Sequence, residues 1–184
     1  TVKTRIGWSS NSPNPIYFSL RLQEAGAQLI TLHGRTREQG FSGKSNWEAI
    51  AKVKQAINIP LIANGDIKNT SDAINCLKIT KADGLMIGRG SLGAPWTVGQ
   101  IDAFLSTKDA INTPQTKERI NLVLEQLNEL LKIKGDHGLN IAKKHMNWTC
   151  RSFPGSSELR HSLVRTKTPI EAINLLEEKI LSLG

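Results

Sequence analysis

Glycines and one arginine follow a short apolar run near the middle of the sequence, in the stretch GLMIGRGSLGAPW from Gly84 to Trp96. Glycine gives up side-chain packing and so lets the backbone approach another molecule closely. The pair Ala94-Pro95 predicts the start of a short helix, because proline suits a first helical turn. Amides at a helix start, together with the guanidinium of Arg89, form a suitable site for a phosphate.

A second glycine-bearing stretch, ANGD at residues 63–66, ends the preceding apolar run about two dozen residues earlier. In βα barrels the loops after strands 7 and 8 frequently form a phosphate site. If the chain holds the last four strands of a barrel, these two stretches follow strands 7 and 8. The backbone amides that would hold a phosphorylated ligand are those of Gly65, Asp66, Gly88 and Arg89. The alternative is that both stretches are tight turns before helices.

Lys3 and His33 are further candidates, one within an apolar strand and the other at a strand end. An unpaired lysine is expensive to bury, so Lys3 makes sense if it points into a barrel mouth toward an anion or a reduced, negatively charged ring. It could equally be a lysine that reaches solvent. His33 could donate to a ligand carbonyl or phosphate, although a lone histidine is more often a satisfied polar residue.

The elements that must position these residues alternate between strand and helix. We expect strands over 1–6, 29–32, 59–66 and 82–88, and helices over 16–25, 46–57 and 69–80. In the last helix, Ala73, Ile74 and Leu77 should share the buried face, and residues 69–71 supply cap candidates. This alternation predicts an α/β fold with a parallel sheet: the C-terminal half of a (β/α)8 TIM barrel, over residues 1–107.

Residues 108–184 are expected to form an all-helical second domain. Thr113-Pro114 should open a long helix that Gly135 ends, and a second helix should span 139–150. The stretch SFPGSSE resembles a capping box with Ser156 or Ser157 as the cap, and a last helix should begin near Pro169.

Between residues 140 and 167, six basic residues stand against one acidic residue. Trp148 and Phe153 lie among them, and positive charge beside aromatic rings suits RNA, where phosphate contacts and base stacking act together. The candidate RNA-binding residues are Lys143, Lys144, His145, Arg151 and Arg160. The alternative is a solvated helical face that packs through Trp148.

Composition limits the remaining possibilities. The 184 residues carry a net charge of +8, which suggests a polyanionic partner. We expect a cytoplasmic protein, since no apolar stretch approaches the length of a membrane span and no signal peptide is apparent. Cys76 and Cys150 are far apart and outside any Cys-x-x-Cys pattern, so we expect neither a disulfide framework nor a metal site. Because the chain starts at Thr1 with an apparent strand, we interpret it as a piece of a longer protein.

The chain resembles the C-terminal part of tRNA-dihydrouridine synthases, most closely the bacterial B-type group. The matching motifs are VKTRIGW, ITLHGRTREQGFSGKSNWEAIAKVKQAINIPLIANGDI, ADGLMIGRGSLGAPW and AKKHMNWTCRSFPGSSELR. HGRT, NGDI and GRG are specific as a set, although each alone is weak. They extend from residue 1 to about residue 160.

The resemblance implies an FMN-dependent barrel followed by a helical tRNA-binding domain, and NADPH-driven reduction of specific uridines to 5,6-dihydrouridine in tRNA. Lys3 and His33 would contact the flavin or the uracil. FMN and its phosphate would be held by Asn64, Gly65, Asp66, Gly88 and Arg89, and tRNA would meet the surface around Lys143, Lys144 and His145.

The family's catalytic cysteine lies in the N-terminal half, which this sequence does not include. Neither Cys76 nor Cys150 occupies the family's motif, so we assign no catalytic residue, and we expect the chain alone to be inactive and to bind FMN poorly. Two other functions stay open: a non-catalytic RNA-binding module on a barrel remnant, and another FMN- or phosphate-binding barrel oxidoreductase.

Overall fold

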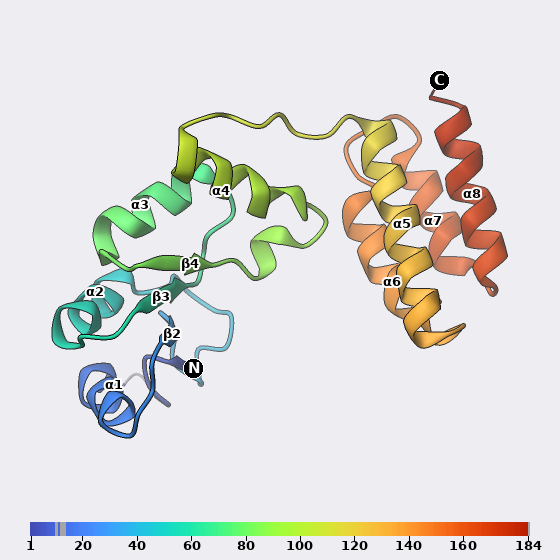
Figure 1. Ribbon diagram of the computed structural model, residues 1–184. Helices are drawn as coiled ribbons and strands as arrows, with labels where there is room; N and C mark the ends of the chain where they lie inside the picture. The colour runs from blue at the N-terminus through green and yellow to red at the C-terminus, as the bar shows by residue number, and fades with distance from the viewer. Residues whose placement is uncertain (10, 12–13, 184) are drawn as a thin grey trace. The chain divides into compact units, whose positions relative to one another are not determined.

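The computed structural model describes residues 1–9, 11 and 14–183, and it separates into two compact units. The first unit comprises residues 1–91 and 97–110, and the second comprises 92–96 and 111–184. Each unit has its own apolar core. The ribbon in Figure 1 follows the elements of both units from the N-terminus to the C-terminus.

The first unit alternates strands and helices around a four-stranded parallel sheet with the order β1-β2-β3-β4. Its elements are β1 (Val2–Arg5), α1 (Pro15–Glu24), β2 (Ile30–His33), α2 (Trp47–Ala56), β3 (Leu61–Asn64), α3 (Thr70–Thr80), β4 (Gly84–Met86), the 3-10 turn η1 (Arg89–Ser91) and most of α4 (Trp96–Thr107). The predicted α/β class and the parallel sheet are confirmed.

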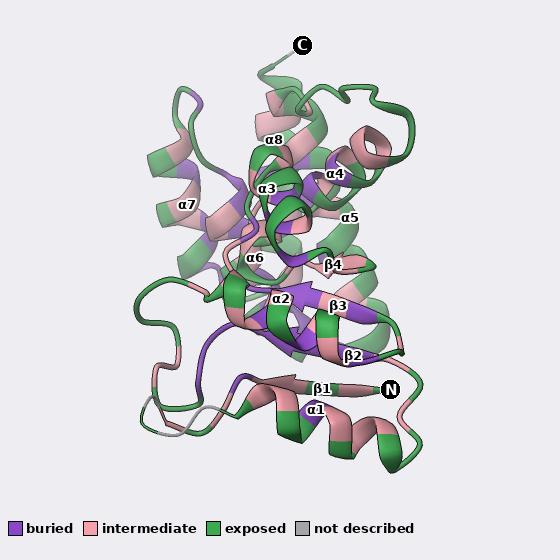
Figure 2. Cartoon of the chain, turned by 90° about the vertical axis from the view of Figure 1, so that its left-hand side faces the viewer, coloured by how far each residue is buried: buried purple, intermediate pink, exposed green. Residues whose placement is uncertain are grey.

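The apolar pattern of each element explains its place in this core. Ile30 and Leu32 of β2 and Leu61 and Ala63 of β3 are fully buried in the cluster that also contains residues of α2 and α3. Figure 2 shows β2 and β3 mostly buried, whereas β1 is only partly covered. The central strands therefore contribute most of the buried surface of the sheet.

Helix caps decide several boundaries in this unit. The side chains of Asn46 and Asn69 accept hydrogen bonds from the amides of Ala49 and Asp72, so the expectation that residues 69–71 supply the cap of α3 is confirmed. The expectation that Ile74 belongs to the buried face is wrong. Ile74 is 39% exposed, because the buried side of α3 passes through Ala73, Cys76 and Thr80 instead.

The helix after Pro95 was expected to be short. It is α4, which is 12 residues long. Ile101 and Leu105 extend it, because they pack on the core of the first unit. Pro95 marks only the start of this helix in the sequence. The apolar face that follows determines how far the helix continues.

The second unit is described by α5 (Thr116–Lys134), α6 (His137–Thr149), α7 (Ser156–Arg165) and α8 (Pro169–Leu181). Its core collects apolar residues from all four helices, including Ile120, Met146, Leu163 and Leu176. Gly135 ends α5 with a φ of 56°, and Thr168 caps α8 through the amide of Glu171. The serine cap expected for α7 is wrong: Gly155 occupies the cap position with a φ of 75°, and it has no side chain to accept a hydrogen bond.

Candidate functional site

The C-terminal ends of the strands and the loops that follow them line a cavity of about 1060 Å³. All seven residues predicted to bind a cofactor lie around this one cavity: Lys3, His33, Asn64, Gly65, Asp66, Gly88 and Arg89. They come from β1 itself and from the ends of β2, β3 and β4, which the parallel sheet brings together. Positions far apart in the sequence are thus assembled around one space.

Register explains why side chains from different strands meet here. Arg5 pairs with His33, His33 with Asn64, and Asn64 with Met86 across the sheet. Residues two apart on a strand share a face, so Lys3 lies on the same face as Arg5. Lys3 is exposed and lines the cavity. Its ammonium group therefore avoids the desolvation cost that an unpaired, buried lysine would have.

The lining of the cavity is strongly basic. Two carboxylates, those of Asp66 and Asp72, face six cationic side chains: Lys3, Arg5, Arg35, Lys44, Lys68 and Arg89. A concave surface lined by one sign of charge raises the local concentration of ligands with the opposite sign. The charge balance favours an anionic ligand.

Backbone conformation at the end of β3 requires glycine. Gly65 has a φ of 119°, and a Cβ there would meet the Ser45 hydroxyl and the His33 ring. The next residue, Asp66, also has a positive φ, of 58°, a conformation that aspartate tolerates better than most residues. The chain therefore turns sharply here and presents backbone rather than side chains.

The end of β4 has the same character. A Cβ on Gly90 would strike the Ile67 carbonyl, whereas a Cβ on Gly88 would meet nothing within 4 Å. Within the described residues, the amides of Gly65, Asp66, Gly88 and Arg89 are among those at this edge that donate to no protein group. These are the amides that the sequence analysis assigned to a phosphate.

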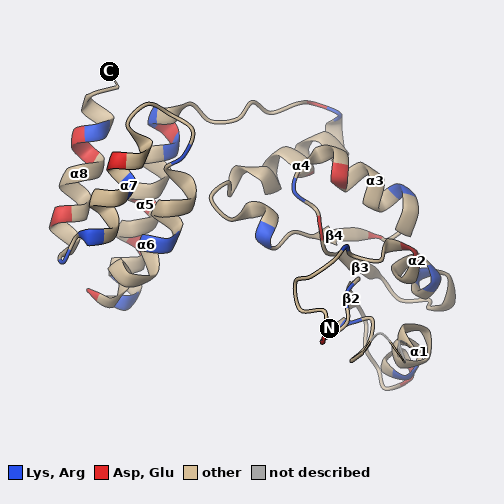
Figure 3. Cartoon of the chain, turned by 180° about the vertical axis from the view of Figure 1, so that it is seen from behind, with Lys and Arg blue, Asp and Glu red and all other residues tan. Residues whose placement is uncertain are grey.

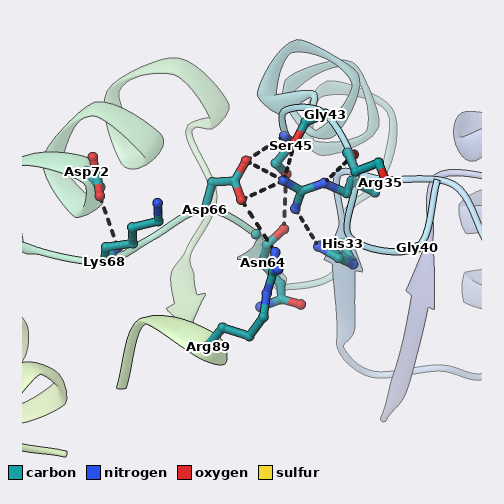
Figure 4. Close-up of polar contacts among 12 residues, drawn as sticks. His33, Arg35, Gly40, Gly43, Ser45, Asn64, Asp66, Lys68, Asp72 and Arg89 are labelled. Atoms are coloured by element: carbon teal, nitrogen blue, oxygen red, sulfur yellow. Dashed lines mark hydrogen bonds and ion pairs between the residues drawn. The ribbon is translucent and has the colours of Figure 1, made fainter. Parts of the chain in front are cut away.

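The carboxylate of Asp66 is held by an arginine that the sequence analysis missed. Figure 4 shows Arg35 Nη2 donating to both carboxylate oxygens, at 2.7 and 2.8 Å, while the Ser45 amide donates to Oδ2 at 2.8 Å. Burial tends to raise the pKa of Asp66, but the hydrogen bonds from Ser45 and Arg35 and the charges of Arg35 and Arg89 outweigh it, so the pKa is lowered. Asp66 is ionised and neutralised by its partners.

His33 is neutral at physiological pH. Its side chain is buried, and burial together with the charges of Arg5, Lys3 and Arg35 lowers its pKa to about 4, against the opposing effect of Asp66. A neutral imidazole has one donor nitrogen and one acceptor nitrogen. His33 can therefore form hydrogen bonds to a ligand without adding a charge.

Two predicted residues have protein contacts of their own. Asn64 Nδ2 donates to the Met86 carbonyl at 2.7 Å, which ties β3 to β4. The Arg89 guanidinium lies 4.5 Å from the centre of the Phe41 ring and 3.9 Å from the Asp66 carboxylate, with half of its side chain exposed. Arg89 is thus oriented at the cavity wall but remains accessible to a ligand.

Besides Arg35, the sequence analysis missed Arg5 and Trp47. Arg5 donates to the carbonyls of Thr36 and Gly40 at 2.8 and 3.0 Å, and Trp47 Nε1 donates to the Gly65 carbonyl at 3.0 Å. The available signal was alternation: Arg5 follows Lys3 by two residues, and Arg35 follows His33 by two.

The five candidate RNA-binding residues differ in their surroundings. Lys143 Nζ donates to the Thr166 carbonyl at 2.6 Å, and Arg160 donates to the Cys150 carbonyl at 2.8 Å, so both fasten helices of the second unit together. His145 packs edge-on against Trp148. Lys144 and Arg151 are exposed, although Arg151 also donates to a carbonyl of α6.

Lys144 lies on α6, and Arg151 follows the end of that helix. Figure 3 shows basic and acidic positions mixed over α5 to α8. Of the five candidates, Lys144 and Arg151 are the two whose side chains are exposed.

Neither cysteine lines the cavity. Cys76 and Cys150 are buried in the cores of the first and second units, and burial raises the pKa of each thiol to about 11. Among the described residues no group of His, Cys, Asp and Glu could hold a metal ion, and no helix is long and apolar enough to span a membrane.

Similarity to known proteins extends over nearly the whole chain. Residues 1–183 match the family model of dihydrouridine synthases. The chain belongs to the dihydrouridine synthase family. The resemblance of its motifs to that family is confirmed.

Several curated relatives extend this result. The chain is 48% identical over 180 residues to "Probable tRNA-dihydrouridine synthase 1" of Synechocystis sp., covering 98% of this chain and 51% of the relative. It is 40% identical over 171 residues to "Probable tRNA-dihydrouridine synthase" of Rickettsia bellii, covering 92% and 52%. It is 38% identical over 161 residues to "tRNA-dihydrouridine synthase B" of Pseudomonas syringae, covering 87% and 48%. The chain spans about half the length of the curated relatives it matches.

Proposed function

We propose that this chain is the FMN-binding and tRNA-binding part of an enzyme that reduces specific uridines in tRNA to 5,6-dihydrouridine, with NADPH as the reductant. In this proposal the four strands are the last four of a (β/α)8 barrel, and residues 108–184 bind tRNA. The observation that carries it is the basic cavity, which four strand ends of a dihydrouridine synthase family member build together.

The cavity suits a phosphorylated flavin. Amides without an acceptor lie at the ends of β3 and β4, where they would meet a phosphate, and the open space beside Gly88 would leave room for one. In this arrangement Gly65, Asp66 and Gly88 would bind the phosphate through backbone N–H groups, with Arg89 adding its guanidinium. FMN, when bound, supplies hydride transfer.

The remaining residues orient the ring and the substrate. Lys3, with its exposed ammonium on the cavity face, would stabilise negative charge on a reduced ring. His33 and Asn64 border the same cavity and can form neutral hydrogen bonds. The proton donor is expected outside this chain, since both cysteines here are buried thiols of raised pKa.

The substrate would be held by charge and by displacement of one base. A uridine inside a stacked stem cannot reach a buried cavity, so the target nucleotide must leave its stack. Lys144 and Arg151 would contact phosphates of the tRNA.

Arg89→Ala in the full-length protein tests the phosphate assignment. We expect it to lower FMN retention by about tenfold or more, with tRNA affinity little changed, because a charged hydrogen bond to phosphate is lost. Flavin absorbance per mole of purified protein measures retention. Lys52→Ala, which removes an exposed lysine of α2 outside the cavity, is the control. Equal flavin content in the Arg89→Ala and parent proteins would contradict the assignment.

A further inference from the structure

Arg35 is the most completely enclosed cation of the cavity. Its residue is 2% exposed, although it follows β2 at the cavity edge. Burying a guanidinium is costly unless its donors are satisfied by well-placed partners. An arginine kept in such a place is therefore expected to have a specific task.

The donors of Arg35 reach three separate segments. Nε donates to the Ser42 carbonyl at 3.1 Å, and Nη2 donates to the Gly43 carbonyl at 2.6 Å. The same Nη2 binds the Asp66 carboxylate after β3. Nη1 points at Nε2 of His33, 3.5 Å away, as Figure 4 shows. One side chain thus joins the loop after β2, the turn after β3 and the imidazole between them.

These contacts decide which nitrogen of His33 carries the proton. A guanidinium can only donate hydrogen bonds, so the nitrogen that faces it must act as the acceptor. The positive charge also disfavours a proton on Nε2. Both effects place the proton of the neutral ring on Nδ1.

The same contacts decide how Asp66 affects an anion. Its carboxylate lies next to amides that have no acceptor and would repel a phosphate if it were unpaired. Arg35 neutralises it and, with the Ser45 amide, fixes its two oxygens. The turn can then offer its amides to an anion.

We propose that Arg35 is a positioning residue of this site, which keeps Nε2 of His33 unprotonated and neutralises the Asp66 carboxylate beside the anion-binding amides. It acts through His33 and Asp66, without touching the ligand. The inference rests on the proposed function only for the identity of the anion.

The first test is made on the flavin-free, full-length protein with ¹⁵N-labelled histidine. NMR should show His33 at neutral pH with Nδ1 protonated and Nε2 unprotonated, assigned by loss of the signal in His33→Gln. In Arg35→Gln the ring should become a mixture of tautomers. A parent protein in which Nε2 carries the proton would overturn the proposal, whether or not any variant folds.

The second test measures binding of inorganic phosphate and of FMN by calorimetry. Arg35→Gln should weaken both by about tenfold or more, since the partly buried Asp66 carboxylate is left without its partner beside the anion. Arg35→Gln combined with Asp66→Asn should recover most of the phosphate affinity, because the repelling charge is removed as well. Arg37→Gln, which removes an exposed arginine from the same loop, should change neither.

Equal losses in Arg35→Gln and in the double variant would show a purely structural role and overturn the proposal. A protein that binds phosphate as expected but does not retain FMN would contradict the proposed function while leaving the role of Arg35 intact. The two failures are therefore distinguishable.

Discussion

At the scale of single residues, the cavity combines excess positive charge with a neutral histidine. His33 is buried beside Arg5, Lys3 and Arg35, and with burial these charges lower its pKa to about 4. The ordinary histidine pKa is near 6.5, so the unfolded chain takes up a proton at a pH where the folded protein does not. This difference links the stability of the first unit to pH.

We expect His33 to destabilise the fold as pH falls from about 6.5 toward about 4, because only the unfolded state gains a proton in this window. Above pH 6.5 the histidine should contribute no pH dependence. Urea unfolding of the parent and of His33→Gln from about pH 8 down to about pH 4.5 measures this, because the range covers the fall from the ordinary histidine pKa toward the lowered one. The free energy of unfolding of the variant should fall less steeply as the pH is lowered.

His161→Gln is the control, since it removes an exposed histidine of the second unit. Its acid limb should match that of the parent. Identical acid limbs in the parent and in His33→Gln would show that the charges around His33 do not depress its protonation.

The residues visible in the sequence were those at strand ends with an unusual type, such as Lys3, His33 and Arg89. Arg35 and Arg5 also stand at or near strand ends, but no role could be assigned to them, because their partners are carbonyls and a carboxylate that only the folded loops bring to them. A pattern can place a residue at an edge, but it does not show which backbone groups turn toward that edge.

At the scale of elements, the turns after β3 and β4 pack closely because a glycine at the contact has no side chain. Gly90 lies against the Ile67 carbonyl and the Lys68 Cα, whereas Gly88 faces open space at the cavity. The two glycines of one short stretch therefore serve different purposes, one for packing and one for access.

Gly90→Ala should destabilise the first unit by about 1–3 kcal/mol, because the added methyl group forces two turns apart. Gly88→Ala should leave stability nearly unchanged yet weaken FMN retention, since its methyl group enters the space proposed for the phosphate. Chemical denaturation and flavin absorbance measure the two effects separately. The reverse pattern, with Gly88→Ala the less stable variant, would contradict this division.

The presence of the helices and strands could be predicted from the periodicity of apolar residues. Several helix ends could be predicted from the residues that cap them, as at Asn69 and Gly135. The failures have physical causes. Ile74 is exposed because tertiary packing chose Ala73 and Cys76 for the narrow buried side of α3. At α7 the chain needs a left-handed residue, so Gly155 takes the cap position and the neighbouring serines do not.

At the scale of the whole molecule, the two units carry separate proposed tasks. The first gathers basic side chains at one sheet edge, and the second exposes Lys144 on α6 and Arg151 just after it. The α/β class and the family could be predicted from the sequence. The sequence could not predict which basic side chains lack a protein partner. Lys143 and Arg160 donate to backbone carbonyls that only the packing of the helices brings near them.

Lys144→Ala should weaken tRNA binding and make its salt dependence shallower by about one unit of slope, as expected for one lost phosphate contact. Lys143→Ala should instead lower the unfolding temperature, because the Thr166 carbonyl loses its donor. Binding isotherms at several salt concentrations and thermal unfolding measure the two effects. An unchanged salt slope in Lys144→Ala would exclude this lysine from the tRNA surface, and Lys117→Ala on α5 is the control.

The central claim is tested most directly by supplying the full-length protein with NADPH and tRNA that lacks dihydrouridine. We predict a purified protein with flavin absorbance, NADPH oxidation that requires this tRNA, and new dihydrouridine in the recovered tRNA. A colourless full-length protein, or NADPH oxidation without any dihydrouridine formed, would contradict the account.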